Sequence, residues 1–182
     1  EETSLRQEPT AIAVIDRANE SSYLFEATPE FRDQLYRLQQ EAAQPLSGIF
    51  LTHAHIGHYT GLMHLGREAM GTRDMPVYAM PRMSAFLRDN GPWSQLVSLG
   101  NIELRALQHM TPVNLSAVTV TPFLVPHRDE YSETVGYRIQ GPNRSAIFIP
   151  DINKWEDWDE SIVEMVESVD YALIDASFFA DG

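Results

Sequence analysis

The chain has 182 residues, a hydrophobic share of 43% and a formal net charge of −13. This size predicts a single domain over residues 1–182, because two domains of ordinary size would need a longer chain. The negative charge excludes a nucleic-acid surface, which requires clustered Lys and Arg. A small molecule or a peptide fits better as the partner, and the composition leaves the oligomeric state open.

The sequence contains no cysteine, which excludes disulfides, thiolate metal ligands and a cysteine nucleophile. No apolar stretch is long enough to span a bilayer, and the first residues carry no signal-peptide pattern, so no membrane partner is expected. The localisation stays open, with the cytoplasm favoured. The chain ends directly after a strand-like run, and we therefore expect pieces at the N- and C-terminal ends to be missing.

Apolar periodicity and turn residues predict a mixed α/β (α+β) chain in which helices alternate with strands before the second half becomes rich in strands. Thr28-Pro29-Glu30 is typical of a helix start. The predicted strands lie at 11–15, 23–25, 48–51, 77–79, 102–107, 118–125, 135–139, 146–149 and 171–174. The predicted helices lie at 28–45, 60–70, 82–89 and 157–166.

Three histidines follow the predicted strand that ends at Leu51: His53, His55 and His58. A His-x-His pair at a strand end can direct two imidazoles at one ion, and histidine is the commonest protein ligand of zinc. A polar loop whose histidines only form hydrogen bonds is the alternative. The close spacing of the three favours a metal site over that alternative.

Two later strands also end in candidate ligands, His127 after 118–125 and Asp151 after 146–149. If these strands share one sheet with the strand before His53, the ligands meet at one edge. Three imidazoles and a carboxylate would leave a coordination position open for water, as in catalytic metal sites. Each residue alone is more typical of a turn or a cap.

The segment His53-Ala54-His55-Ile56-Gly57-His58, with the later His127 and Ile149-Pro150-Asp151, resembles the signature of the metallo-β-lactamase fold superfamily. The resemblance implies an αββα sandwich with a metal cleft at one edge of its two sheets. It further implies that His53, His55 and His127 hold a first metal. Asp151 would bridge to a second metal held partly by His58, which makes Asp151 and His58 the predicted catalytic residues.

Within that superfamily, several segments resemble the pyrroloquinoline quinone biosynthesis B (PqqB) family and its hydrolase-like relatives. These segments are Thr60-Gly61-Leu62, Met75-Pro76-Val77-Tyr78, Asn90-Gly91-Pro92-Trp93, Val125 to Glu130 and Gly136-Tyr137-Arg138.

The chain departs from the superfamily pattern at Gly57, where the family has an aspartate that binds the second metal. The usual last histidine, expected beyond the strand before Asp175, is absent from the sequence. His58 and Asp151 alone are too few ligands for tight binding of a second ion. We therefore expect one zinc ion, with iron as the alternative.

The first functional prediction is a metal-dependent hydrolase in which a metal-bound water attacks a small ester, lactone, amide or similar substrate. Its predicted cleft contacts are Arg128, Tyr131 and Tyr137. The second, implied by the PqqB resemblance, is iron-dependent oxidation of a peptide precursor in quinone cofactor synthesis. The third is a non-catalytic binding or carrier protein with a degraded metal site, which Gly57 favours.

Overall fold

The computed structural model describes residues 9–42 and 44–177, and it contains two five-stranded sheets. The first sheet has the order β1-β2-β3-β4-β5, with β1 Ile12–Asp16, β2 Ser21–Phe25, β3 Leu46–Phe50, β4 Met75–Ala79 and β5 Ile102–Ala106. The second has the order β10-β9-β8-β7-β6, with β6 Val113–Leu115, β7 Val118–Leu124, β8 Val135–Gln140, β9 Ser145–Ile149 and β10 Tyr171–Ile174.

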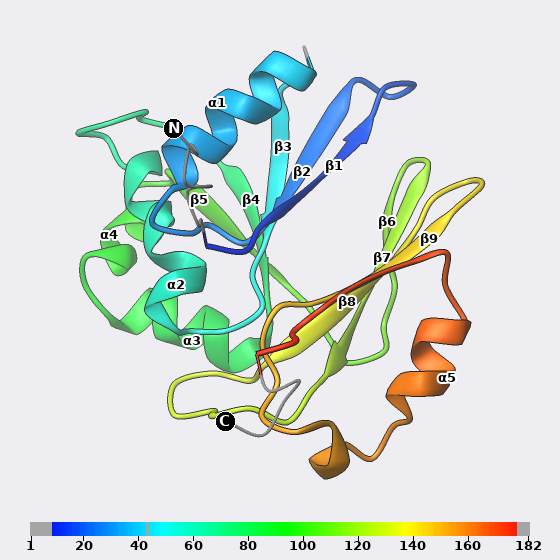
Figure 1. Ribbon diagram of the computed structural model, residues 1–182. Helices are drawn as coiled ribbons and strands as arrows, with labels where there is room; N and C mark the ends of the chain where they lie inside the picture. Colours follow the sequence, from blue (N-terminus) through cyan, green and yellow to red (C-terminus); the bar gives the residue numbers. More distant parts are fainter. Residues whose placement is uncertain (1–8, 43, 178–182) are drawn as a thin grey trace, which may run out of the picture.

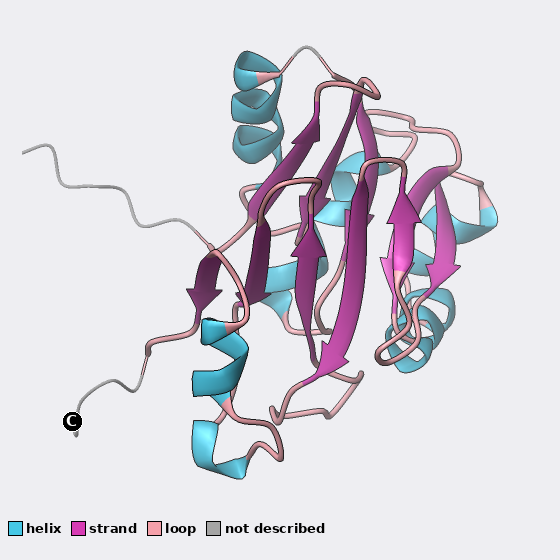
Figure 2. Cartoon of the chain, turned by 90° about the vertical axis from the view of Figure 1, so that its right-hand side faces the viewer, coloured by secondary structure: helices cyan, strands magenta, loops and turns pink. Residues whose placement is uncertain are grey.

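Helices cover the outer faces of both sheets (Figure 1). On the first sheet these are α1 Phe31–Glu41, α2 Ile56–Tyr59, the 3-10 helix Thr60–Leu65, α3 Pro81–Asp89 and α4 Trp93–Ser98. On the second sheet these are the 3-10 helix Trp155–Asp157 and α5 Ile162–Glu167. Figure 2 views the second sheet from the side that carries α5. The order of layers is αββα, as the family resemblance implied.

Alternation along the strands explains why the two sheets pack face to face. Phe25 and Phe50 contribute to the apolar cluster between the sheets, where they meet Tyr137 and Phe148 of the second sheet. Leu24, one residue away, belongs to the cluster between the first sheet and its helices. Successive strand residues point to opposite faces, so strands that are apolar on both faces are required in the middle of a four-layer structure.

A third apolar cluster holds α5 and its preceding loop against the outer face of the second sheet. It includes Phe123, Val125 and Ile147, with Trp155 and Trp158 packed against them. The ring of Trp158 lies 5.8 Å from that of Phe123 in a stacked arrangement. Both tryptophans therefore contribute to the packing of this outer layer.

The structure corrects several predicted elements. The helix expected over 60–70 is a short α2 followed by a 3-10 helix that ends at Leu65, because Gly66 takes an extended conformation. The helix expected over 157–166 is divided between a 3-10 turn and α5. The elements α4 and β6 were not predicted. None of the helices in the described ranges 9–42 and 44–177 is long and apolar enough to cross a membrane.

The ligand-bearing strands lie in two sheets, as the αββα resemblance implied, and the condition that they share one sheet is not met. β3 belongs to the first sheet, whereas β7 and β9 belong to the second. β7 and β9 both pair antiparallel with β8 and therefore run in the same direction. Their carboxyl ends lie at the same edge of the second sheet, next to the end of β3.

Candidate metal centre

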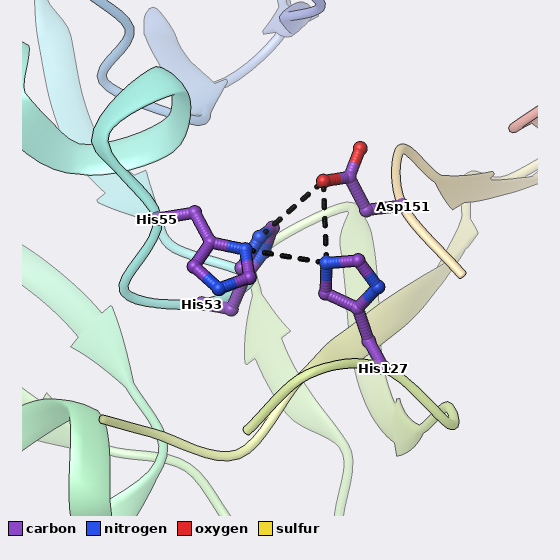
Figure 3. A group of neighbouring side chains, drawn as sticks. All are labelled: His53, His55, His127 and Asp151. Carbon is purple, nitrogen blue, oxygen red and sulfur yellow. Dashed lines mark hydrogen bonds and ion pairs between the residues drawn. The ribbon is translucent and has the colours of Figure 1, made fainter. Parts of the chain in front are cut away.

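The predicted ligands come from three strand ends that meet at one edge of the sandwich. His53 and His55 follow β3, His127 follows β7, and Asp151 follows β9. Figure 3 shows the three imidazoles and the carboxylate directed at one another. Residues on neighbouring sheets are thus brought together by loops rather than by a shared sheet.

Backbone and side-chain hydrogen bonds fix the segment after β3. The Thr52 N–H donates to Oε1 of Glu26 over 2.9 Å, and the Thr52 carbonyl accepts from the Val135 N–H over 3.2 Å. The Ala54 N–H donates to the hydroxyl of Ser132 over 2.8 Å. The segment is therefore tied to both sheets, and this restricts the orientation of the histidine that lies between Thr52 and Ala54.

The ligand atoms form a close group, to which His53 and His127 contribute Nε2 and His55 contributes Nδ1. Oδ2 of Asp151 lies 3.4 Å from Nε2 of His53 and 3.6 Å from Nε2 of His127. Nε2 of His127 lies 3.2 Å from Nδ1 of His55. The ligand atoms of these four residues all lie within 4.8 Å of one another, and in the described part of the chain they are the one such group with metal-ligand chemistry.

Three of the six separations among these four ligand atoms match those around a zinc-sized ion. Bonds of about 2.0–2.1 Å from zinc to nitrogen or oxygen place neighbouring ligand atoms roughly 3.3–3.4 Å apart, close to the observed 3.2 to 3.6 Å. His53 is 1% exposed, and its buried Nε2 makes no regular hydrogen bond with the described residues beyond the 3.4 Å approach of Asp151. A buried nitrogen without a partner is costly, and a bound metal would remove that cost.

Burial and neighbouring charges favour the protonation states that a metal requires in three of the four ligands. It lowers the pKa of His53 to about 4, and it also lowers the pKa of His127. Burial disfavours the charge on Asp151, but the neighbouring imidazoles of His53 and His58 outweigh it and hold the pKa of Asp151 below its ordinary value. The neutral imidazoles of His53 and His127 and the ionised carboxylate of Asp151 are therefore available near neutral pH.

His58 lies beside the group but outside it. Its Nε2 is 3.3 Å from Oδ2 of Asp151, and its Nδ1 is 2.8 Å from Oε2 of Glu26 in an ion pair whose angle departs from that of a regular hydrogen bond. Burial alone would lower the pKa of His58, but Asp151 and Glu26 raise it to about 10. Its predicted role as a ligand of a second metal stays a prediction.

Glu26 is a buried acidic residue beside the site that the sequence did not single out. It follows β2, is fully buried, and contacts both Thr52 and His58. Its backbone has a φ of 86°, a left-handed conformation that is uncommon for a residue other than glycine and is often found at functional sites. The available signal was its position at a strand end, the same signal that identified the other candidates.

The loop after His127 contributes a second carboxylate. Oε2 of Glu130 lies 3.0 Å from Nε2 of His55 and thereby fixes the ring whose Nδ1 faces the group. The loop is anchored by Glu133, which accepts hydrogen bonds from the N–H groups of Arg82 and Met83 at the start of α3. Such carboxylate–histidine pairs commonly orient metal ligands.

The predicted substrate contacts divide into two kinds. Arg128 is exposed, and Tyr131 is exposed with its ring 5.6 Å from that of Phe86, so both stay predictions. The prediction for Tyr137 is wrong. Its side chain is fully buried between the sheets and its hydroxyl donates to the carbonyl of Leu51, because alternation along β8 directs this position into the core.

Two further histidines, His64 and His109, lie outside the metal-ligand group. The ring of His64 stacks on Phe31 with the centroids 6.3 Å apart. Nδ1 of His109 accepts a hydrogen bond from the Leu124 N–H over 3.1 Å. Neither belongs to the group formed by the four ligands.

Sequence comparison identifies the family of this fold and site. A model of the beta-lactamase superfamily domain matches residues 22–182. The chain belongs to this family, which confirms the resemblance predicted from the histidine motif. A search of curated proteins gave no match.

Solved structures agree on the fold. Zinc-bound PqqB from Methylobacterium extorquens superimposes with a TM-score of 0.74 at 21% sequence identity, covering 92% of this chain and 60% of that one. A diphosphatase from the PhnP family superimposes with a TM-score of 0.61 at 22% sequence identity, covering 92% of this chain and 59% of the diphosphatase chain. The metallo-β-lactamase fold protein YhfI from Bacillus subtilis superimposes with a TM-score of 0.58 at 15% sequence identity, covering 80% of this chain and 56% of the YhfI chain. This chain therefore spans about 60% of the length of the PqqB chain that it resembles.

Proposed function

We propose that the chain carries the metal centre of a metal-dependent hydrolase that acts on a small ester, lactone, amide or similar bond. One observation carries the proposal: three imidazoles and one carboxylate from three strand ends converge with separations that fit a single ion. Membership of the beta-lactamase superfamily supports it. The diphosphatase and β-lactamases among the structural neighbours make hydrolysis the favoured reaction class.

We propose that Nε2 of His53, Nδ1 of His55, Nε2 of His127 and a carboxylate oxygen of Asp151 hold one ion. Zinc is favoured, because the donor set and the spacing suit it and because the similar PqqB structure is zinc-bound; iron is the alternative. When bound, such an ion acts as a Lewis acid that polarises a substrate oxygen and lowers the pKa of water.

The protein's own residues have distinct proposed roles around that ion. Asp151 supplies the negative charge of the ligand set and contacts His58, which is itself anchored by Glu26. This chain of contacts restrains the Asp151 carboxylate at the edge of the site. Because the Asp151 side chain is 31% exposed, it can also accept a hydrogen bond from a bound molecule. The exposed Arg128 and Tyr131 are proposed to contact the substrate.

Metal content of the purified chain tests this proposal. We expect about one zinc ion per chain after reconstitution, and we expect His53→Ala and His127→Ala to lose it together with any esterase or lactonase activity. His64→Gln is the matched control, because His64 lies outside the group. Retention of full metal binding in both alanine variants would refute the site. Metal binding without turnover across esters, lactones, amides and phosphodiesters would favour a binding protein.

A second candidate function is a PqqB-like oxidation of a peptide precursor at a single iron. The observation that favours it is the TM-score of 0.74 with PqqB, higher than the 0.61 with the diphosphatase. Ligands of the same chemical types suit ferrous iron as well as zinc. The two candidates are distinguished by elemental analysis of protein purified without added metal, followed by measurement of oxygen consumption after loading with Fe²⁺ under anaerobic conditions. Stoichiometric zinc without oxygen consumption would exclude the oxidative candidate.

A further inference from the structure

A cavity of about 490 Å³ lies next to the metal centre, between the loop that follows β7 and the loop that precedes α5. His127 belongs to both the metal centre and the cavity, because its Nε2 faces the other ligands while the residue also lines the cavity. The remaining ligands do not line it. The cavity is therefore a separate space that shares one wall with the proposed metal centre.

The charged side chains that line this cavity are all acidic. Five carboxylates line it: Asp129, Glu133, Asp157, Asp159 and Glu160. No Lys or Arg is among the described residues that line it. Arg82 contacts Asp129 and Glu133 from α3, so two of the five carboxylates have hydrogen-bond donors. The other three have no hydrogen-bond or ion-pair partner within residues 9–42 and 44–177.

A buried hydroxyl without a partner lies in the same wall. Thr134 is 3% exposed, lines the cavity, and its Oγ1 has no hydrogen-bond partner among the described residues. The next residue, Val135, packs between the two sheets. Because successive side chains point to opposite faces, the side chain of Thr134 is directed to the outer face, where the cavity lies. A buried hydroxyl left without a partner is a site for a ligand donor.

The apolar part of the lining indicates which kind of cation fits. Leu124, Val125, Pro126 and Trp158 complete the wall, and the indole N–H of Trp158 donates to the Leu124 carbonyl over 3.0 Å, which fixes the ring. An aromatic ring beside carboxylates suits an organic cation. In the described part of the chain the cavity carboxylates form no group with ligand atoms close enough for a metal ion, since the one such group is the His/Asp cluster.

We propose that this cavity is a subsite for an organic cation, an ammonium or guanidinium group carried by the substrate of the neighbouring metal centre. The carboxylates attract the cation, Trp158 contacts its flat or methylene part, and the Thr134 hydroxyl accepts one of its N–H groups. The link to turnover rests on the proposed hydrolase function, whereas cation binding itself does not.

Binding of benzamidine tests the subsite without any metal. In an NMR titration of the metal-free protein, we expect benzamidine to shift the Trp158 indole N–H signal and neutral benzamide to leave it in place. The double variant Asp159→Asn/Glu160→Gln should weaken benzamidine binding about three- to tenfold, because exposed ion pairs are individually weak. The matched control Asp89→Asn/Glu20→Gln removes the same charges from exposed positions away from the cavity and should change the affinity less than about twofold.

A third variant tests whether the Thr134 hydroxyl contacts the bound cation. Thr134→Val keeps the shape of the side chain, and because the hydroxyl has no partner it should leave stability unchanged while weakening benzamidine binding about threefold. Three results would overturn the proposal: equal binding of benzamide, equal weakening by the control variant, or a response to Ca²⁺ in place of benzamidine. The last result would identify an inorganic cation site.

Measurements of ester hydrolysis distinguish the cation subsite from the proposed hydrolase function. With zinc-loaded protein, two aryl esters that differ only in a terminal ammonium or methyl group should differ in kcat/KM, and the difference should fall in Asp159→Asn/Glu160→Gln. Hydrolysis of neither ester, with benzamidine binding intact, would refute the hydrolase function and leave the cation subsite standing. Equal hydrolysis of both esters would support the hydrolase and refute the link between the cavity and its substrate.

Discussion

Glu26 and His58 form a buried ion pair in which Oε2 of the carboxylate lies 2.8 Å from Nδ1 of the imidazole. Glu26 is fully buried, and its other oxygen accepts the Thr52 N–H. One carboxylate at the end of β2 therefore fixes both ends of the segment that carries His53 and His55. The segment that carries two of the proposed ligands is thus held by a residue that is not among them.

Replacement of Glu26 by alanine should destabilise the protein and weaken metal binding. It would leave the Thr52 N–H and the His58 imidazole without their buried partner, and we expect the free energy of unfolding to fall by about 3 kcal/mol. Zinc affinity should fall about tenfold. Urea unfolding and a zinc titration measure the two effects.

Two variants make this prediction specific. Glu26→Gln keeps an acceptor for the Thr52 N–H, so it should lose less stability than Glu26→Ala. Glu20→Ala, at an exposed turn position, should change neither quantity. Wild-type stability in Glu26→Ala would show that the pair does not support the fold.

The stability of the metal-free protein should be greatest near pH 6.5. Burial lowers the pKa of His53 to about 4 from an ordinary 6.5, so between these values the unfolded chain binds a proton that the folded chain does not, and stability falls as the pH falls. The pKa of His58 is raised to about 10, so the folded chain retains a proton that the unfolded chain loses, and stability falls as the pH rises from 6.5.

Thermal unfolding of the chelator-treated protein from pH 4 to pH 10 measures this dependence. The variant His58→Gln should lose the decline above pH 6.5 and keep the decline below it. A wild-type profile that is flat between pH 6.5 and 10 would contradict the assignment of the raised pKa to His58.

Glu130 should tune metal affinity without affecting the fold. Its carboxylate lies 3.0 Å from Nε2 of His55 and holds the opposite nitrogen toward the other ligands. Because the Glu130 side chain is 50% exposed, we expect Glu130→Gln to weaken zinc binding only about three- to tenfold, at the low end of the usual effect of such partners.

A zinc titration compared with thermal unfolding checks this prediction. Stability of the metal-free protein should be unchanged in Glu130→Gln. The control Glu41→Gln, at the exposed end of α1, should leave zinc affinity at the wild-type value. Equal affinities in the two variants would mean that Glu130 does not orient His55.

The sequence was sufficient to predict the candidate ligands because the relevant pattern is local. His53, His127 and Asp151 each follow an apolar strand directly, and strand ends converge at the edges of α/β structures. That the strands belong to two sheets could not be read from periodicity, since strands buried on both faces have the same pattern in either sheet. The family resemblance supplied the two-sheet arrangement, which the structure confirms.

The missed and mistaken assignments depend on tertiary contacts. Glu26 acquires its role because β2 pairs with β3, which places it beside Thr52. Tyr137 was predicted to contact a substrate in the cleft. Its neighbours Val135 and Ile139 on the same side of β8 face the core, and Tyr137 does too. The short helix α4 begins at Trp93, directly after Asn90-Gly91-Pro92, where Gly and Pro favour a loop.

Gly57 provides the final prediction, because a side chain at this position meets free space. A Cβ at Gly57 would have no atom within 4 Å, and the backbone there is not in the left-handed region. Gly57→Asp should therefore fold normally and restore the carboxylate that the family pattern has next to His58. With His58 and Asp151, this gives three ligands for a second ion, and we expect the zinc content to rise from about one to about two ions per chain.

Gly57→Ala adds the Cβ without the carboxylate and should stay at one ion, and Gly57→Asp/His58→Ala should return to one. If Gly57→Asp binds a single ion, or if wild-type protein already binds two, Gly57 does not determine the number of metals.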